Sequence, residues 1–324
     1  MLYLLFKSII ETDTMRQTIS SIAALAVAVC LLAGCQSDST APTNAAITFN
    51  AKTPAMTRAI FGEGDHPDVG VFAYSTGTAT WEDYSTSAVP NLMSDQLLAY
   101  NGGTGAWAYE PVQYWPKETG AKVSFFAYMP KGTSYLTPAM STGSLTVGYT
   151  WAAENDLLYA ASTDRPRPYP NAAVELLFRH ALAKVNFKVR KKTAGGANVM
   201  VTKLVANTDA NTSGTFSLLS GTWTDMSGSG TNSAQALNDN AAHDVTASDK
   251  GSGDLVGRAL LMPGTVNMNF VISYQVGSTT YSNKAGALAS SLTLEQNYEY
   301  DVILVIDGDV IESYVLRPRS AEQW

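Results

Sequence analysis

The later part of the chain alternates apolar and polar residues with a period of two. The clearest runs are Ala183 to Arg190, Val266 to Val276 and Tyr298 to Ile306. Successive side chains of a strand point to opposite faces of a sheet, so each run predicts a strand with one face in a core. The polar side of the first run, which we expect to face water, holds Lys184, Asn186, Lys188 and Arg190.

The earlier part of the chain also reads as strands. Val69 to Ser75 is a continuous apolar run that predicts a strand covered on both faces, and Lys122 to Met129 and Ile47 to Phe49 alternate. Ser220 to Asp254 is polar and rich in glycine, so we expect a long surface excursion there with at most one short strand. No stretch has convincing helical spacing, and the chain is therefore predicted to be all-β, built from sandwiches.

The N-terminus has the form of a bacterial lipoprotein signal. Arg16 precedes an apolar run that ends in Leu31-Leu32-Ala33-Gly34-Cys35, and twelve apolar residues are too few to span a bilayer. Residues 1–34 are therefore predicted to be a signal peptide, with translation expected to begin at Met15, and the Cys35 thiol to carry lipid. Residues 35–46 are polar and predict a flexible tether that links the lipid to the folded part.

Charge and cysteine content narrow the partners. The formal net charge of −7 argues against nucleic acid. The two cysteines are Cys30, within the predicted signal, and Cys35, so we expect no disulfide in the mature chain.

Catalytic and metal-binding patterns are missing from the sequence. His66, His180 and His243 do not lie at metal-ligand spacing, and we find no nucleophile elbow, zinc-protease helix or phosphate loop. We expect His180 to be a hydrogen-bonded structural residue, and we expect no enzyme activity, cofactor or metal. Six tryptophans could stack on sugars, so a surface glycan-binding lipoprotein of a nutrient-uptake system is the alternative function.

Several segments, taken in their order after the signal, resemble the fimbrillin family, the lipoprotein subunits of Bacteroides-type surface fimbriae. They are Ile47-Thr-Phe-Asn-Ala51, Thr57-Arg58-Ala59, Val69-Gly-Val-Phe-Ala-Tyr74, Trp107-Ala-Tyr-Glu-Pro111, Tyr114-Trp115-Pro116, Val123-Ser-Phe-Phe-Ala-Tyr-Met-Pro130, Phe178-Arg-His180-Ala-Leu-Ala-Lys184-Val, Leu261-Met-Pro-Gly264 and Tyr298-Glu-Tyr300. The resemblance implies two transthyretin-like β-sandwich domains in tandem. We place them at residues 47–179 and 180–324, with the boundary near Arg179.

The resemblance also implies a mode of assembly. An Arg-specific protease would cut between Arg58 and Ala59 and release the lipidated N-terminal strand, and a strand from a neighbouring subunit would fill the groove. The candidate donor is the C-terminal strand, with Val310, Ile311, Tyr314, Val315 and Leu316. The alternative is that this strand belongs only to its own domain.

The implied setting is the cell surface. The expected location is the outer membrane for the lipidated precursor and a fimbrium after processing. The expected partners are copies of this chain, related fimbrial subunits and a receptor on a host or bacterial surface, with a position in the stalk favoured over the tip or the anchor.

Overall fold

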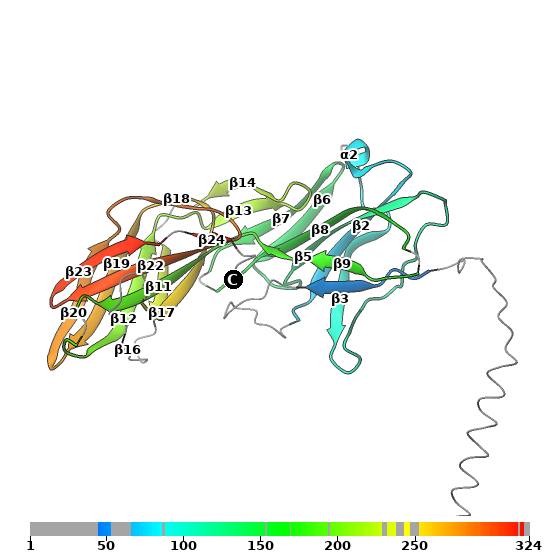
Figure 1. Cartoon of the computed structure of the whole chain (residues 1–324). Coiled ribbons are helices and arrows are strands. Elements are labelled where there is room, and N and C mark those ends of the chain that lie inside the picture. The colour runs from blue at the N-terminus through cyan, green and yellow to red at the C-terminus, as the bar shows by residue number, and fades with distance from the viewer. Residues whose placement is uncertain are drawn as a thin grey trace, which may run out of the picture. The chain divides into compact units, whose positions relative to one another are not determined.

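Strands make up most of the described chain. The computed structural model describes residues 45–52, 66–85, 88–152, 154–168, 170–193, 195–228, 232–237, 243–246, 253–316 and 318–320 (Figure 1). The helix α2 (Trp81–Tyr84) is a single turn, whose first residues are capped by the side chain of Thr80. Among the described residues, no helix is long and apolar enough to cross a membrane.

A six-stranded sheet lies at the centre of the earlier part. Its strands, in spatial order, are β10 (Arg179–His180), β8 (Leu158–Pro166), β5 (Lys122–Met129), β2 (Val69–Gly77), β3 (Met93–Asn101) and β4 (Ala106–Ala108). β2 and β5 pair with Phe72 opposite Phe126, and almost every side chain in both strands is buried. This confirms that the apolar run from Val69 to Ser75 is covered on both faces.

Two smaller sheets provide that cover. On one face, β1 (Phe49–Lys52) and β9 (Val174–Leu177) form a parallel pair, whose apolar residues share a core with Val123, Phe125 and Ala127 of β5. Phe126 and Tyr128 of β5 face the other core, which is covered by a four-stranded sheet. Its strands are β14 (Thr222–Ser227), β13 (Ser213–Ser217), β7 (Ser144–Thr150) and β6 (Leu136–Ser141).

The later part of the chain forms a β-sandwich. One sheet contains β17 (Asp254–Leu261), β11 (Ala183–Lys191), β22 (Tyr298–Asp307), β23 (Val310–Val315) and β24 (Arg319–Ser320). The facing sheet contains β15 (Asn232–Leu237), β16 (His243–Val245), β12 (Val199–Thr208), β19 (Met268–Val276) and β20 (Thr279–Ala287). A short pair, β18 (Gly264–Val266) and β21 (Leu292–Leu294), lies beside them. The alternate apolar residues of β11 and β22 fill the core between the sheets, as their period-two pattern predicts.

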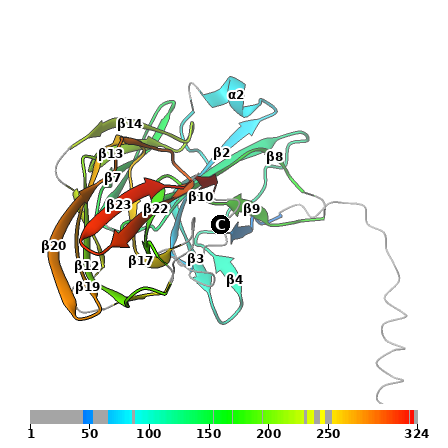
Figure 2. The ribbon, with the colours of Figure 1, turned by 60° about the vertical axis from the view of Figure 1, so that its left-hand side comes forward.

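The earlier and later parts of the chain share one core, in which Phe126 and Leu145 lie in one cluster with Phe216 and Leu260. β7 pairs with β13 across the predicted boundary near Arg179, with Gly148 opposite Thr215, and the two strands lie side by side in both views (Figures 1 and 2). The indole nitrogen of Trp151 also donates to the carbonyl oxygen of Leu260 at 2.7 Å. The division into domains at residues 47–179 and 180–324 therefore stays a prediction.

Two sequence-based expectations are wrong. Ser220 to Asp254 contains β14, β15 and β16 rather than at most one short strand, because these polar segments pair with β13 and β12. The polar side of β11 is not fully solvated, since Lys184 is only 3% exposed and Asn186 only 4%. Carboxylates of the neighbouring strand β22 pair with these two side chains.

Candidate assembly site

The positions that the sequence assigns to lipidation and processing, Cys35, Arg58 and Ala59, lie outside the described residues. The strand between them is described from Ala45 to Lys52. We use the name N-terminal strand for residues 45–52 and the name slot for the part of the fold that holds it.

The N-terminal strand buries alternate side chains from Ala45 to Phe49. Ala45, Ile47 and Phe49 are all buried, and Ile47, at 1% exposed, is buried most deeply. The Phe49 ring makes edge contacts with Tyr109 and Phe125, at centroid distances of 5.6 and 5.5 Å. These residues belong to the core that covers one face of the six-stranded sheet. The N-terminal strand is therefore part of a hydrophobic core rather than a loose extension.

Backbone hydrogen bonds hold the N-terminal strand on both sides. On one side, Ile47 donates to the Gln113 carbonyl oxygen and Trp115 donates to that of Ala45, both at 2.9 Å. On the other side, the strand pairs in parallel with β9. In Figure 1 the N-terminal strand is the blue arrow that lies next to the green arrow of β9. There the Val174 amide donates to the Thr48 carbonyl oxygen at 2.7 Å. The slot thus offers unpaired backbone groups on two sides when the strand is absent.

A tyrosine hydroxyl contacts the backbone at the middle of the N-terminal strand. The Tyr109 hydroxyl lies 2.9 Å from the Ile47 carbonyl oxygen, to which it can donate, and it accepts from the Gln113 amide at 3.1 Å. Burial is the main cause that raises the pKa of Tyr109 above its ordinary value, so the hydroxyl keeps its proton at neutral pH.

One carboxylate marks the polar end of the slot. Glu175 of β9 pairs with the Lys52 ammonium at 2.6 Å and accepts from the Asn50 amide at 2.9 Å. These two hydrogen bonds hold the pKa of the Glu175 carboxyl below its ordinary value. Both partners belong to the N-terminal strand, so Glu175 would lose them if that strand departed.

The candidate donor strand is paired within its own sheet in this structure. β23 lies antiparallel to β22, with Val315 opposite Val302 and Ile311 opposite Ile306. Ile311 and Val315 pack against the core between the two sheets of the later part of the chain, whereas Val310 is 51% exposed. On the other face, the Arg190 guanidinium lies 5.8 Å from the Tyr314 ring. Asp307 pairs with Val310 across a tight turn that contains Gly308, so β22 and β23 form a hairpin.

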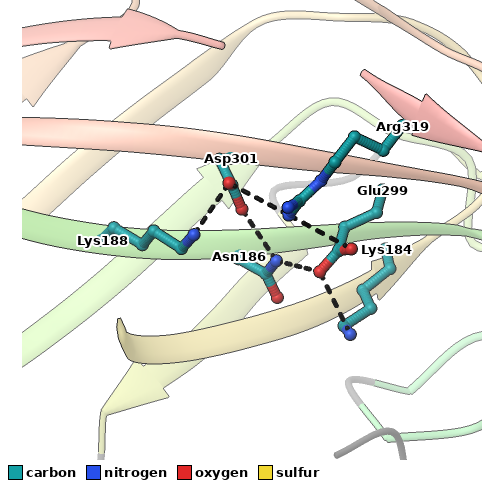
Figure 3. A network of polar contacts seen from close by, with 6 residues as sticks. All are labelled: Lys184, Asn186, Lys188, Glu299, Asp301 and Arg319. Atoms are coloured by element: carbon teal, nitrogen blue, oxygen red, sulfur yellow. Dashed lines mark hydrogen bonds and ion pairs between the residues drawn. The ribbon is translucent and has the colours of Figure 1, made fainter. Parts of the chain in front are cut away.

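A polar network, which the sequence analysis missed, lies beside the donor candidate (Figure 3). The Glu299 carboxylate contacts Lys184 and Arg319, and the Asp301 carboxylate contacts Lys188 and Arg319. Burial alone would raise the pKa of Asp301, but hydrogen bonds from Lys188 and Asn186 outweigh it and lower that pKa. The signal in the sequence was that Glu299 and Asp301 alternate with Tyr300, so both carboxylates lie on the face of the strand opposite to the Tyr300 ring.

His180 is buried next to the Asp156 carboxylate, with Nδ1 2.9 Å from a carboxylate oxygen. Burial and then the Asp156 charge raise the pKa of the adjacent Tyr149. The part of the chain that the structure describes holds no group of histidines, cysteines or carboxylates able to bind a metal ion. His180 thus sits in a buried polar contact, which fits a structural role.

A family model described as fimbrillin-like matches residues 53–315, which is most of the chain. The chain belongs to the fimbrillin-like family. The matched range begins directly after β1 and ends at the last residue of β23. The resemblance noted in the sequence is thereby confirmed.

Proteins that are similar in sequence or structure are also described as fimbrial or cell adhesion proteins. The fimbrium subunit Fim1C of Phocaeicola vulgatus is 25% identical over 151 residues, 41% of this chain and 39% of that protein. The chain thus matches well under half of that relative's length. A crystal structure of a fimbrial protein from Bacteroides vulgatus aligns with a TM-score of 0.65 and 18% identity, covering 85% of this chain and 99% of that one. A candidate cell adhesion protein from Bacteroides ovatus aligns with a TM-score of 0.54 and 16% identity, covering 86% and 97%. These structures confirm the predicted all-β sandwich fold.

Proposed function

We propose that this chain is a structural subunit of a cell-surface pilus, exported as a lipoprotein through Cys35, trimmed after Arg58 and joined to its neighbours by strand exchange. Membership of the fimbrillin-like family supports the pilus, and so does the name of the fimbrium subunit Fim1C. The sequence Leu31-Leu32-Ala33-Gly34-Cys35 supports export with a lipid anchor.

The N-terminal strand carries the proposal for assembly. It fills a hydrophobic core, yet it lies at the very start of the described fold, ahead of the candidate cleavage site in the sequence. A cut between Arg58 and Ala59 would leave residues 45–52 held by non-covalent contacts alone. Loss of the strand would uncover apolar side chains and unpaired backbone groups, and a strand from another subunit could satisfy both.

The donor in this proposal is β23. It follows β22 at the end of the sheet, and its outer residue Val310 is exposed. Because the slot and the donor are different surfaces of a subunit, a donor strand that enters the slot of a neighbouring subunit makes a head-to-tail contact, and such contacts can propagate as a filament. A chain with both a trimming site and a donor fits a stalk position better than a tip or an anchor.

The test examines the N-terminus of the subunit in filaments sheared from the cell surface. We expect it to begin at Ala59, and a subunit that begins with lipidated Cys35 would contradict trimming. In parallel, recombinant Gln36 to Trp324 is digested with an Arg-specific protease, and its intact mass is measured. We expect one early cut after Arg58.

The matched control is Arg58→Gln, which removes the site without changing the slot. It should resist the early cut and should stay lipid-anchored and outside filaments in the cell. An Arg58→Gln chain that still enters filaments would overturn the role of trimming.

A further inference from the structure

The proposed strand exchange uses a C-terminal donor strand but leaves open which subunit supplies the strand that fills the slot of this chain. The core side chains that enclose the slot restrict the answer. Three alternate positions, now filled by Ala45, Ile47 and Phe49, are enclosed by the core. A replacement strand must therefore place apolar side chains at three positions spaced by two. This requirement rests on the proposed function, in which a strand from a neighbour enters the slot.

The C-terminal strand resembles the N-terminal strand when the two are laid in the same direction. With Val310 on Ala45 and Arg317 on Lys52, Ser313 falls on Thr48 and Tyr314 falls on Phe49. In this register the Tyr314 ring takes the place of the Phe49 ring, and Arg317 takes the place of Lys52, which pairs with Glu175. The overlay fails at one position, because Glu312 falls on Ile47.

That position is the least tolerant in the slot. Ile47 is the most deeply buried residue of the N-terminal strand, and the cluster around it is formed by apolar side chains. A buried carboxylate without a partner is strongly unfavourable. In the present structure Glu312 instead lies at the surface, where it pairs with the Lys192 ammonium at 2.8 Å.

Other registers do not remove the problem. Only three sets of three alternate residues exist between Val310 and Leu316. Two of these sets contain Glu312, and the third is Ile311, Ser313 and Val315, which would put a small hydroxyl side chain where Ile47 packs. Every register therefore places Glu312 or Ser313 in the core.

We propose that Glu312 excludes the C-terminal strand of this chain from the slot of its own kind, so that the neighbour filling the slot is a different subunit. That partner's donor strand carries apolar side chains at three alternate positions, with a large one in the place of Ile47. It also carries a cation or an amide donor that can pair with Glu175. This narrows the expected partners from copies of this chain to related subunits.

The test uses fluorescent peptides and the chain from Gln36 to Trp324, cut after Arg58 and freed of the released fragment in denaturant before refolding. The first peptide, Asn44 to Lys52, should bind tightly because it restores the native contacts. The peptide Asp309 to Arg317 should bind at least about 100-fold more weakly. The same peptide with Glu312→Ile should recover most of that loss.

The outcomes separate the inference from the proposed function. If the first peptide binds and the wild-type C-terminal peptide binds within about threefold of its Glu312→Ile form, the inference is overturned and the slot stands. If no peptide binds, the slot does not exist and the inference falls together with the proposed function.

Full chains give a second readout. Trimmed wild-type chain should stay monomeric by size-exclusion chromatography and electron microscopy, whereas trimmed Glu312→Ile should form head-to-tail chains. Asp309→Ile is the matched control, because it adds the same apolar residue outside the slot positions and should behave as wild type. Filaments of trimmed wild-type chain alone would contradict the inference.

Discussion

The Tyr109 hydroxyl lies 2.9 Å from the carbonyl oxygen of Ile47, and this contact joins the N-terminal strand to the segment that runs along its side. The same hydroxyl accepts from the Gln113 amide, so a single side chain satisfies backbone groups on two segments. The contact fixes the strand at its most buried residue.

Replacing Tyr109 with Phe tests this contact. The change leaves the Ile47 carbonyl and the Gln113 amide without their partner, and we expect the free energy of unfolding to fall by about 1–2 kcal/mol. Urea denaturation measures it. Tyr114→Phe is the control, because Tyr114 is 49% exposed, and it should change stability by less than about 0.5 kcal/mol. Equal effects of the two variants would show that the Tyr109 hydroxyl contributes nothing specific.

Replacing Phe49 with Ala tests the packing of the N-terminal strand. Phe49 is enclosed between Tyr109 and Phe125, so the smaller side chain leaves a cavity. We expect the free energy of unfolding to fall by about 3–5 kcal/mol. Thr48→Ala, at an exposed neighbouring position, should have little effect in the same denaturation experiment. A Phe49→Ala chain as stable as Thr48→Ala would show that the strand does not complete the core.

The network in Figure 3 predicts how stability responds to acid. The pKa of Asp301 is lowered in the folded chain, so its charge stabilises the fold above the unfolded-state pKa, near 3.8. As pH falls below that value and through the folded-state pKa, this stabilisation is lost. We expect the free energy of unfolding of Asp301→Asn to be lower than that of wild type by about 3 kcal/mol at neutral pH, and to fall less steeply as the pH drops below about 4.

Urea titrations at a series of pH values measure this difference. Asp225→Asn is a suitable control, because Asp225 is exposed on β14, away from the network. Parallel pH profiles for wild type and Asp301→Asn would contradict the prediction.

Sequence alone predicted the strands that have one apolar face. The alternation in β11 and β22 gives their faces directly, because both strands contribute every second residue to one core. It could not reveal that Lys184 and Asn186 are buried, since their burial depends on Glu299 and Asp301 of a strand more than one hundred residues later. Pairing between distant strands leaves little trace in one sequence.

Sequence alone predicted the strand at the candidate assembly site but not the residues that hold it. The alternation of Ile47 and Phe49 indicated the N-terminal strand, and its burial agrees. The roles of Tyr109 and Glu175 could not be predicted, because each acts through a contact with residues 47–52 that only the fold creates. The polar strands β14 and β15 were missed for the same reason, since their partner strands decide their structure.

The shared core predicts that the two parts of the chain unfold together. β7 pairs with β13, and Trp151 donates to the Leu260 carbonyl oxygen, so opening either part breaks contacts of the other. We expect one denaturation midpoint for β5 and β19 when their hydrogen exchange is followed by mass spectrometry in increasing urea. Trp151→Phe removes this hydrogen bond, so it should lower the free energy of unfolding by about 1 kcal/mol and shift both midpoints by the same amount. Two separate midpoints, or a shift confined to one strand, would mean that residues 47–179 and 180–324 fold as independent domains in spite of the core that they share.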